Sequence, residues 1–550
     1  MKKSLSIVVR ILLCLVAEAV FFWFELPPLN LRSEAFWRFL FGSIILCSII
    51  LGFSAIVDFF RRRLRDETPP RLTKETFRGI GTSLKIVCGT LVGIILFSVV
   101  SSLIGAQFFN ASRYASLIET VDGNFATEVA ELNMSQIPVV DRDTATHMGQ
   151  RKLGEMSDLV SQFEIAEDYT QINFKGTPTR VTPLVYADFI KWCFNSSEGI
   201  PAYISVNLTT QEADLVRLSD LGLDNIRYSR SEYFLRNLDR YLRFKHPTKI
   251  FDEISFEVDE NGVPYWVASV VDYRIGVWNG TDITGAVLLN AVTGESQYYP
   301  LEDIPRWVDQ VYDESLLMQQ LQYNGLLSGG FWNSIFGQRG CVMPTDGYNY
   351  IALDDDVWMY TGITSVTSDE SNIGFVLVNL RTKEARYYTQ AGAEEYSAMD
   401  SARGQIQEKN YTATFPILLN VGGRPTYFMS LKDSAGLVKM YAYVDMAQYQ
   451  IVGTGTSVEA AKTAYLNRLR SESANLPDDE IIPPTSVSGT VEAVATAVID
   501  GDTHYYVKLQ NTDGIYILPA TLSDALPFIK AGDTVTLTLT GTTCTAVQFH

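Results

Sequence analysis

The sequence predicts an α+β protein with three transmembrane helices at its N-terminus, tandem α+β modules after them and a small β-barrel at its C-terminus. Three observations carry this prediction. Long uncharged apolar runs are confined to the first 106 residues, a strand-turn-strand pattern recurs 89 residues further on, and short alternating strand patterns close the chain. At 550 residues the chain is long enough for three or four domains.

The charge of the chain is divided unevenly. The net charge is −19, yet residues 1–106 hold 13 Lys/Arg against 7 Asp/Glu, which leaves 31 of the 44 basic and 56 of the 63 acidic residues to the remainder. A basic apolar head therefore precedes a strongly acidic body. Because nucleic acid is a polyanion, the body is not expected to bind it.

Three segments of the head are predicted to cross a bilayer. Residues 39–57 and 86–104 each run for 19 residues without a charge, close to the ~20 that a spanning helix needs. Residues 4–24 form another candidate, apolar except for Arg10 and Glu18. No small-x-small cleavage site follows it, so it is expected to be a retained helix rather than a signal peptide.

Basic residues between the second and third segments set the expected orientation. The 25–36 connection contains only Arg32, whereas the later connection is rich in Lys and Arg. Basic loops stay in the cytoplasm during insertion. We therefore expect a multi-pass protein of the cell membrane with a cytoplasmic N-terminus and an extracytoplasmic body from about residue 107. The basic residues of the later connection are Arg61, Arg62, Arg63, Arg65, Arg71, Lys74, Arg78 and Lys85.

Two features of the head bear on function. Glu18 lies in the middle of a span, where a carboxylate is a candidate for an ion pathway. The favoured interpretation is a hydrogen-bonded Glu that faces the helix bundle. Gly89 and Gly93 form a Gly-x-x-x-Gly pair, which permits close helix approach and hence an oligomer through the transmembrane helices.

Cysteine usage favours a bacterial cell envelope. The sequence shows no disulfide framework and no Cys-x-x-Cys metal knuckle, whereas a secreted eukaryotic ectodomain of this size usually carries more paired cysteines. Cys14, Cys47 and Cys88 fall in the spans, and Cys193, Cys341 and Cys544 are scattered over the body.

An internal repeat organises the body. Residues 283–299 align without gaps on residues 372–388, and 8 of the 17 pairs are identical. Each copy reads as an apolar strand, a short polar turn and an aromatic strand that leads into a helical segment. The expected helices are the stretch with Ile304, Val308 and Val311 after the first copy, and residues 391–407 after the second. A third helix is expected from Thr456, with Glu459 at capping-box spacing.

A second motif, Gly-x-Pro before a strand, occurs three times. Gly permits a positive φ and Pro fixes the next corner, so each copy predicts a turn that enters a strand. The copies begin at Gly199, Gly262 and Gly423.

The repeat carries a resemblance to a known family. A helix and a small antiparallel sheet whose last hairpin contains Thr293-Gly294-Glu295 resemble PepSY-type modules, and residues 376–388 do so more weakly, with Lys383 in place of the turn glycine. The resemblance implies PepSY-like modules over residues 185–470 and a binding or inhibitory role rather than catalysis. Three spans before a repeat-bearing ectodomain are also similar to uncharacterised envelope proteins of Gram-positive bacteria.

The remaining segments complete the expected domain order. Residues 107–184 are expected to form a helical juxtamembrane connector, and residues 471–488 a Pro-rich acidic linker. Five short strands with a helical turn resemble an OB-type barrel over residues 489–550. The strands are expected at 491–499, 504–510, 515–518, 535–539 and 545–549, with the helical turn at 522–529.

The segment 325–356 leaves two interpretations open. It contains Phe331, Trp332 and Phe336 and ends in Asp354-Asp355-Asp356. An exposed aromatic loop beside carboxylates would bind a peptide, a glycan or a calcium ion. Alternatively, its aromatic side chains pack under the adjacent module and its acids stay solvated.

No catalytic constellation is recognisable. None of the four histidines has zinc-ligand spacing, and no Gly-x-Ser-x-Gly elbow occurs. Gly453-Thr454-Gly455 lacks the Lys of a phosphate loop and is better explained as a strand-to-helix turn. Asp500-Gly501-Asp502 is either a calcium ligand set or, more simply, a hairpin tip. No catalytic, cofactor-binding or metal residue is predicted, and no cofactor is expected.

These observations favour a non-enzymatic, membrane-anchored binding or scaffold protein of the bacterial cell envelope. Its expected partners are the lipid bilayer and another envelope protein or a wall-associated ligand. One alternative is an accessory or regulatory subunit of a membrane transporter or protease. A lower-ranked alternative is an envelope hydrolase with a carboxylate pair that the sequence does not locate.

Overall fold

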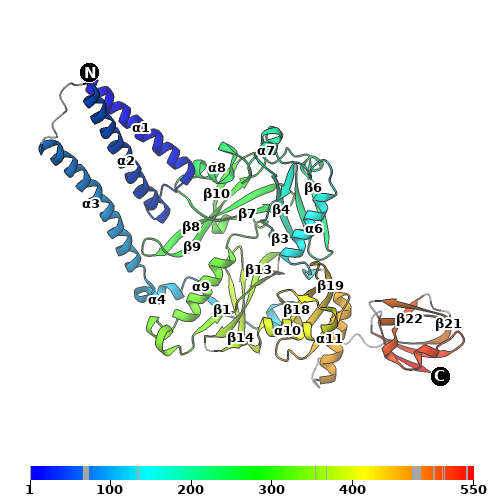
Figure 1. Ribbon diagram of the computed structural model, residues 1–550. Helices are drawn as coiled ribbons and strands as arrows, with labels where there is room; N and C mark the ends of the chain where they lie inside the picture. The colour runs from blue at the N-terminus through cyan, green and yellow to red at the C-terminus, as the bar shows by residue number, and fades with distance from the viewer. Residues whose placement is uncertain are drawn as a thin grey trace. The chain divides into compact units, whose positions relative to one another are not determined.

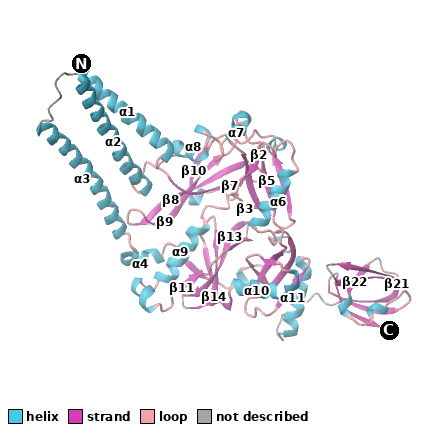
Figure 2. Ribbon diagram, in the orientation of Figure 1, coloured by secondary structure: helices cyan, strands magenta, loops and turns pink. Residues whose placement is uncertain are grey.

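The structure is a computed structural model with a mixed α+β fold (Figures 1 and 2). It describes residues 2–65, 74–132, 136–353, 355–366, 368–472, 485–499, 502–510, 512, 514–540 and 543–550. The chain forms two compact units. The first consists of Met1–Gly123 and Ser135–Glu394, and the second of Asn124–Met134 and Glu395–His550.

Three long helices begin the first unit: α1 (Lys2–Glu25), α2 (Glu34–Arg65) and α3 (Lys74–Ile104). Within the described residues, two segments, Glu34–Ser54 and Leu84–Ile104, are long and apolar enough to cross a membrane by length and composition. The third expected span lies in α1 and is not one of these two. Arg10 and Glu18 interrupt its apolar run.

Three α+β modules, A, B and C, follow in the first unit. Each has a helix before an antiparallel sheet. The strands of module B pair in sequential order, whereas β2 and β3 of module A both pair with β4, and β11 and β12 of module C both pair with β13. Module A contains α6 (Arg142–Gly154), β2 (Phe163–Ile165), β3 (Thr170–Phe174), β4 (Thr177–Tyr186), α7 (Phe189–Asn195), β5 (Ala202–Asn207) and β6 (Glu212–Arg217). Module B contains α8 (Leu238–Lys245), β7 (Ile250–Val258), β8 (Pro264–Ile275), β9 (Asn279–Asn290) and β10 (Ser296–Pro300). Module C contains α9 (Glu314–Leu327), β11 (Val342–Pro344), β12 (Asn349–Leu353), β13 (Asp356–Ser365), β14 (Ser368–Asn379) and β15 (Ala385–Ala393).

Shorter elements connect the long helices to the modules. α4 (Gln107–Ala115) follows α3 directly, and β1 (Thr120–Asp122) adds a parallel strand to β15 of module C. α5 (Phe125–Glu128) belongs to the second unit.

The sequence repeat corresponds to a structural repeat with the same strand register. Tyr298 pairs with Val287 in the β9–β10 hairpin, and Tyr387 pairs with Val376 in the β14–β15 hairpin. All five paired positions of the first hairpin recur 89 residues later. The repeated glycine, Gly285, is explained by crowding, because an added Cβ would lie 2.1 Å from the carbonyl oxygen of Tyr299.

The turn of each repeat explains why the second copy lacks its glycine. Gly294 and Lys383 occupy the same left-handed position, with φ of 76° and 63°. At Gly294 a Cβ would collide with the ring of Tyr228 at 2.4 Å, so only glycine fits there. The Lys383 ammonium instead pairs with Asp282 of β9, at 2.6 Å, and thereby links module C to module B.

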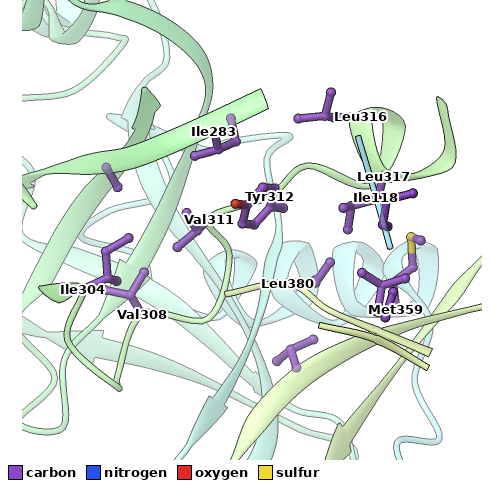
Figure 3. Close-up of a cluster of buried hydrophobic side chains, with 14 of the residues drawn as sticks. Ile118, Ile283, Ile304, Val308, Val311, Tyr312, Leu316, Leu317, Met359 and Leu380 are labelled. Carbon is purple, nitrogen blue, oxygen red and sulfur yellow. The ribbon is translucent and has the colours of Figure 1, made fainter. Parts of the chain in front are cut away.

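Modules B and C share one hydrophobic core (Figure 3). Apolar residues of both sheets meet around the segment 304–321, which joins the two modules. Ile304, Val308 and Val311 are buried in this core. A sheet with one helix buries little surface on its own, so the shared core stabilises both modules.

The helix expected over Ile304, Val308 and Val311 was wrong. Leu301–Asp303 forms a 3₁₀ turn, Ile304 is extended, and the next helix, α9, begins only at Glu314. Pro305 explains the difference, because proline biases the preceding residue towards an extended backbone. The helix-like spacing of Ile304, Val308 and Val311 arises because all three are buried in a segment without regular secondary structure.

The helical connector expected over residues 107–184 was also wrong. Residues 163–186 contain β2, β3 and β4, so the modules begin before residue 185. Lys175 and Gly176 have φ of 53° and 78° and form a two-residue turn between β3 and β4. Paired positive φ values are typical of such tight hairpins.

The second unit contains a fourth module and a separate sheet. The module comprises α10 (Glu395–Gly404), β16 (Thr412–Ala413), β17 (Ile417–Val421), β18 (Arg424–Lys432), β19 (Val438–Asp445), β20 (Val452–Gly455) and α11 (Val458–Glu472). α10 and α11 confirm the helices expected there. Ser457 rather than Thr456 caps α11, because its hydroxyl accepts the N–H of Ala460.

The glycines of two motifs have local structural roles. Gly199, Gly262 and Gly423 have φ of 91°, 80° and 72°, which confirms the predicted Gly-x-Pro turns. Gly453 and Gly455 let α11 cross β20 closely, since added Cβ atoms would lie 2.0 and 2.4 Å from helix backbone nitrogens. Gly453-Thr454-Gly455 is therefore a packing feature and a strand-to-helix turn.

Five strands form the C-terminal sheet, in the order β23-β22-β21-β24-β25. β23 also contacts β25, so the two ends of the order approach each other. The expected helical turn is two 3₁₀ segments, Ala520–Leu522 and Leu526–Phe528. The first strand begins inside the expected linker 471–488, of which residues 473–484 lie outside the described residues. The strands are β21 (Thr485–Ile499), β22 (Asp502–Leu509), β23 (Ile515–Pro519), β24 (Thr534–Thr540) and β25 (Thr543–Phe549).

The crowding at Gly285 yields a stability prediction. Gly285→Ala forces a Cβ against a backbone oxygen, and overpacking of this kind costs about 1–3 kcal/mol. We expect the thermal unfolding midpoint of the full-length protein to fall by several degrees. Gly154→Ala, at the open end of α6, is the control and should not lower the midpoint, because an added Cβ meets nothing there and Ala favours a helix over Gly. Equal midpoints for both variants would contradict the crowding argument.

Candidate functional site

A buried carboxylate on β7 begins the site. The side chain of Glu257 is 0% exposed and accepts three hydrogen bonds. Its Oε2 accepts the N–H of Asp309 at 2.8 Å, and its Oε1 accepts the N–H of Gln310 and the hydroxyl of Ser255, both at 3.1 Å. Glu257 therefore fixes the backbone of the segment that joins modules B and C.

Asp309 extends this connection to module A. It is 2% exposed, and its Oδ2 accepts the N–H of Asn173, at the end of β3, at 2.6 Å. Its Oδ1 is buried and has no hydrogen-bond partner among the described residues. A buried carboxylate oxygen without a donor is costly, so this atom is an unusual feature of a folded protein.

A cavity of about 320 Å³ opens beside Asp309. Asn173 also lines it, with its Nδ2 donating to Asp355 at 2.9 Å and its buried Oδ1 left without a partner in the described structure. Trp307, packed on Tyr265 at a ring distance of 4.9 Å, forms an aromatic wall. The cavity is thus lined by one ring and by two side chains that each carry a buried oxygen without a partner among the described residues. Its remaining lining residues are Ile172, Phe174, Lys175, Val258, Glu260, Asn261, Arg306 and Asp355.

Both signs of charge border the cavity. Glu260 and Asp355 are exposed, and so are Lys175 and Arg306. The neighbouring Asp356 is neutralised by a bidentate pair with Arg381. Asp309 is therefore the buried carboxyl among the lining residues, whereas the exposed side chains of both signs balance each other.

Burial governs the protonation of the two carboxyls. It raises the pKa of Glu257 to about 7, although the hydrogen bonds from Asp309, Gln310 and Ser255 oppose the shift. Burial, together with the charge of Glu257, raises the pKa of Asp309 well above its ordinary value. The pair therefore takes up a proton far more readily than exposed carboxylates do.

A second cavity, of about 360 Å³, lies beside Glu232. This carboxylate is also buried, but both oxygens are satisfied, one by the hydroxyl of Tyr186 and the other by the indole N–H of Trp192, each at 2.8 Å. Both oxygens of Glu232 therefore have a hydrogen-bond partner, whereas Asp309 Oδ1 has none among the described residues.

Three carboxylates could hold a metal ion elsewhere in the first unit. Oxygens of Glu253, Asp313 and Glu314 lie within 4.8 Å of one another. Asp313 already caps α9 by accepting the N–H groups of Ser315 and Leu316. A hydrogen bond to Asp313, together with burial, raises the pKa of Glu253 to about 8. The proximity of these carboxylates is explained by a proton shared between Glu253 and Asp313 and by the role of Asp313 as the cap of α9.

An aromatic surface patch follows α3. We define it as Phe108, Phe109, Phe331, Trp332 and Phe336, whose rings form a continuous cluster with centroids 4.7–5.6 Å apart. Trp332 is 60% and Phe336 77% exposed. The patch thus combines the start of α4 with the insert after α9, and part of the insert does not pack under a module.

The structure places the other candidates of the head as follows. Glu18 accepts hydrogen bonds from Ser43 at 2.7 Å and Cys47 at 3.3 Å on α2. Gly89 and Gly93 face open space among the described residues.

The acidic candidates of the body fall in different places. Asp355 reaches the cavity, Asp356 forms an ion pair, and Asp354 lies outside the described residues. Asp500 and Gly501 also lie outside them, and Asp502 begins β22. All six cysteines are free.

No sequence motif marks the residues of the cavity. Asn173, Glu257 and Asp309 are 84 and 52 residues apart along the chain, and only the fold brings them together. The available signals were a lone acid in the apolar strand Phe256-Glu257-Val258 and a lone acid between Val308 and Val311. Buried acids in such positions are rare unless paired.

Comparisons with known proteins identify no relative. No protein-family model and no curated protein matches the chain. Among solved structures, an ACO/RPE65 chimera matches at 8% identity with a TM-score of 0.13, covering 70% of this chain and 62% of that chain. A levansucrase mutant from B. megaterium matches at 9% identity with a TM-score of 0.17, covering 79% of this chain and 96% of that one. Both scores are too low to carry an argument about fold or function.

The raised pKa values predict how stability depends on pH. Both folded carboxyls bind a proton more tightly than the unfolded chain does. The stabilisation from Glu257 is full below about pH 4 and is lost as the pH rises through about 7, and that from Asp309 is lost as the pH rises through its own raised pKa. We expect the thermal unfolding midpoint to fall between pH 5 and pH 8.

Asp309→Asn should reduce this fall by a few degrees, because an amide places no charge in the buried position. Its oxygen can still accept the N–H of Asn173. Glu302→Gln removes an exposed carboxylate outside the cavity and should keep the wild-type slope. Identical slopes for both variants, measured by differential scanning fluorimetry, would rule out the carboxyl pair as the cause.

Proposed function

We propose that the protein is a membrane-anchored, extracytoplasmic binding protein of the bacterial cell envelope and that it acts without catalysis. Its head crosses the membrane three times from a cytoplasmic N-terminus, and its body holds a ligand in the cavity beside Asp309. The observation that carries this proposal is Asp309, a buried residue that lines a cavity of about 320 Å³ and has one carboxyl oxygen without a partner among the described residues.

Binding fits this geometry better than hydrolysis. A glycosidase places two carboxyl groups on either side of the bond that it cleaves. Here Glu257 is fully buried and both of its oxygens are occupied, so it cannot reach a substrate. Only Asp309 of the pair lines the cavity.

Contacts within the first unit support three crossings. Arg32, in the α1–α2 connection, forms an ion pair with Asp272 of β8 at 2.9 Å. Phe97, near the end of α3, contacts Trp278 in the β8–β9 turn at a ring distance of 5.7 Å. Both contacts join the helices to one hairpin (Figure 1). This agrees with a common extracytoplasmic side and with the basic Arg61–Arg65 stretch at the opposite end of α2.

The resemblances extend the proposal to particular module types. Modules B and C match the PepSY-like pattern of a helix before an antiparallel sheet whose last hairpin carries the repeat. The C-terminal sheet, with β21 paired to both β22 and β24, supports an OB-like barrel. Both assignments favour roles in binding.

An accessory or regulatory subunit of a membrane transporter or protease is the second candidate. It is favoured by Gly89 and Gly93, around which no described atom lies within 4 Å of an added Cβ. Small residues on an open helix face allow another transmembrane helix to approach. The same face permits an oligomer of this chain.

The orientation predicts the labelling of one native cysteine. Cys193 is exposed on module A, whereas Cys341 and Cys544 are buried. A small membrane-impermeant maleimide should therefore label the protein on intact cells, and Cys193→Ser should abolish the labelling. Labelling of Cys193 only after permeabilisation would overturn the extracytoplasmic location.

The aromatic patch predicts contact with the bilayer interface. Its first residue, Phe108, lies four residues after the candidate span ends at Ile104, and exposed Trp and Phe favour the boundary between headgroups and acyl chains. In nanodiscs with brominated lipids, which quench the fluorescence of nearby Trp side chains, Trp332→Phe should show less quenching of its total Trp fluorescence than the wild type does. Trp358→Phe, at a buried position in module C, should not. Equal quenching in wild type and Trp332→Phe would place the patch outside the bilayer.

A further inference from the structure

We infer that an exposed apolar surface of the first unit docks on the lipid bilayer beside the transmembrane head, at the boundary between headgroups and acyl chains. We define this α7–η3 surface as Phe189, Ile190 and Phe194 of α7 together with Phe234 and Leu235 of a 3₁₀ turn, η3 (Phe234–Arg236). The inference rests on the proposed function, because it requires a membrane-anchored chain. It adds a lipid contact that is separate from the aromatic patch after α3.

The α7–η3 surface consists of large apolar side chains that are open to solvent. Its five members are 50–79% exposed. Phe189 and Phe234 both pack against Trp192, at ring distances of 5.4 and 5.8 Å, so the two elements present one continuous apolar surface. A contiguous exposed surface of this kind marks a contact with a membrane or with a partner.

Polar contacts hold the two elements of this surface together. The buried Glu232 accepts the indole N–H of Trp192 on α7 at 2.8 Å. The guanidinium of Arg236, in η3, donates to the carbonyl oxygen of Ser196, just after α7, at 2.9 Å. Phe234 has a φ of 53°, a left-handed conformation that is unfavourable for an aromatic residue. The surrounding contacts therefore fix the outward position of these rings.

Helix α8 connects the α7–η3 surface to the end of α1. Arg240 of α8 donates to the carbonyl oxygen of Phe234 at 2.8 Å, and its guanidinium lies 4.2 Å from the ring centroid of Trp23 in α1. Arg243 of α8 donates to the carbonyl oxygen of Leu26, just after α1, at 2.9 Å (Figure 1). The surface is thus tied through α8 to the end of a long apolar helix.

The end of α1 is level with the ends of both candidate spans. Phe21 of α1 stacks on Phe39, near the start of the candidate span in α2, at a ring distance of 4.9 Å. Trp37 of the same span contacts Phe97, near the end of the candidate span in α3, at 4.6 Å. An apolar surface continuous with these helix ends is expected at the bilayer interface, which Trp and Phe side chains favour.

The local charge permits contact with a membrane. Residues 226–250, which include η3 and α8, hold 7 of the 31 basic residues of the body and only 2 of its 56 acidic residues, so the sign of the body is reversed there. Asp188, Glu198 and Asp239 are nevertheless exposed close to the surface in the sequence. The contact should therefore depend mainly on the apolar side chains and should form with neutral as well as with anionic lipid.

The experiment measures how strongly brominated lipids quench an added tryptophan in nanodiscs that hold the full-length protein. Phe194→Trp places the probe at the most exposed position of the α7–η3 surface. The matched control, Thr210→Trp, places it at an exposed position in the β5–β6 turn, at the opposite end of β5 from α7. The fluorescence that each substitution adds is its signal minus that of the wild type.

We expect brominated lipid to quench the fluorescence added by Phe194→Trp, and to quench it more when the bromine lies near the headgroup end of the acyl chains than near their tips. This should hold in phosphatidylcholine alone and in its mixture with phosphatidylglycerol. The fluorescence added by Thr210→Trp should show no loss. Unfolding midpoints confirm that both variants are folded. At headgroup depth, the neighbouring Cys193 thiol stays within reach of a water-soluble maleimide.

Two results would overturn the inference. If the fluorescence added by Phe194→Trp is as insensitive as that added by Thr210→Trp, the surface lies in water, open to a protein partner. Stronger quenching by bromine at the chain tips would place it in the hydrocarbon core instead of the interface.

The native tryptophans separate these failures from failure of the proposed function. Trp23 and Trp37 lie at the helix ends and report whether the head enters the bilayer. If the wild type is quenched and the added tryptophan is not, the membrane anchor stands and only the docking surface is wrong. If the wild type is not quenched at all, the proposed function fails and the inference fails with it.

Discussion

The arrangement of the first unit depends on one buried carboxylate, Glu257. By accepting the backbone N–H groups of Asp309 and Gln310, it holds the segment that fills the core between modules B and C. Asp309 in turn accepts the N–H of Asn173 and so holds the β3–β4 hairpin of module A. Three modules therefore meet at two side chains. Burial raises the pKa of Glu257 to about 7, and its three hydrogen bonds offset part of the cost of keeping a carboxylate away from water.

The same constraint explains why a cavity persists at the junction. A completed polar network, such as that around Glu232, leaves no acceptor free at the carboxylate. At Asp309 one oxygen accepts the N–H of Asn173, and the other is buried without a partner among the described residues. Glu257 is fully buried and both of its oxygens accept hydrogen bonds, so Glu257 and Asp309 cannot lie on either side of a bond to be cleaved. The geometry of these two carboxyls therefore favours binding over hydrolysis.

Local patterns in the sequence predicted much of the fold, and contacts between distant segments account for what they missed. The register of the repeated hairpins, the positive φ of Gly262 and the position of α11 follow from turn residues and periodicity within short windows. The segment after the first repeat is extended rather than helical, because the apolar spacing of Ile304 and Val308 reflects burial between two sheets. The candidate site has only weak local signals, the lone acids Glu257 and Asp309 between apolar residues. Its residues come from module A, module B and the segment after module B, and their burial is decided by packing that no single window contains.

Hydrogen exchange on the full-length protein tests the central role of Glu257 most directly. The comparison is between wild type and Glu257→Gln, in which one amide N–H donor replaces an acceptor facing Asp309 and Gln310. The account predicts faster exchange in peptides that cover residues 170–178, 250–258 and 304–313 together, with no change in β24 and β25. Faster exchange confined to residues 250–258 would show that Glu257 stabilises only its own strand, and would contradict the claim that it holds three modules in place.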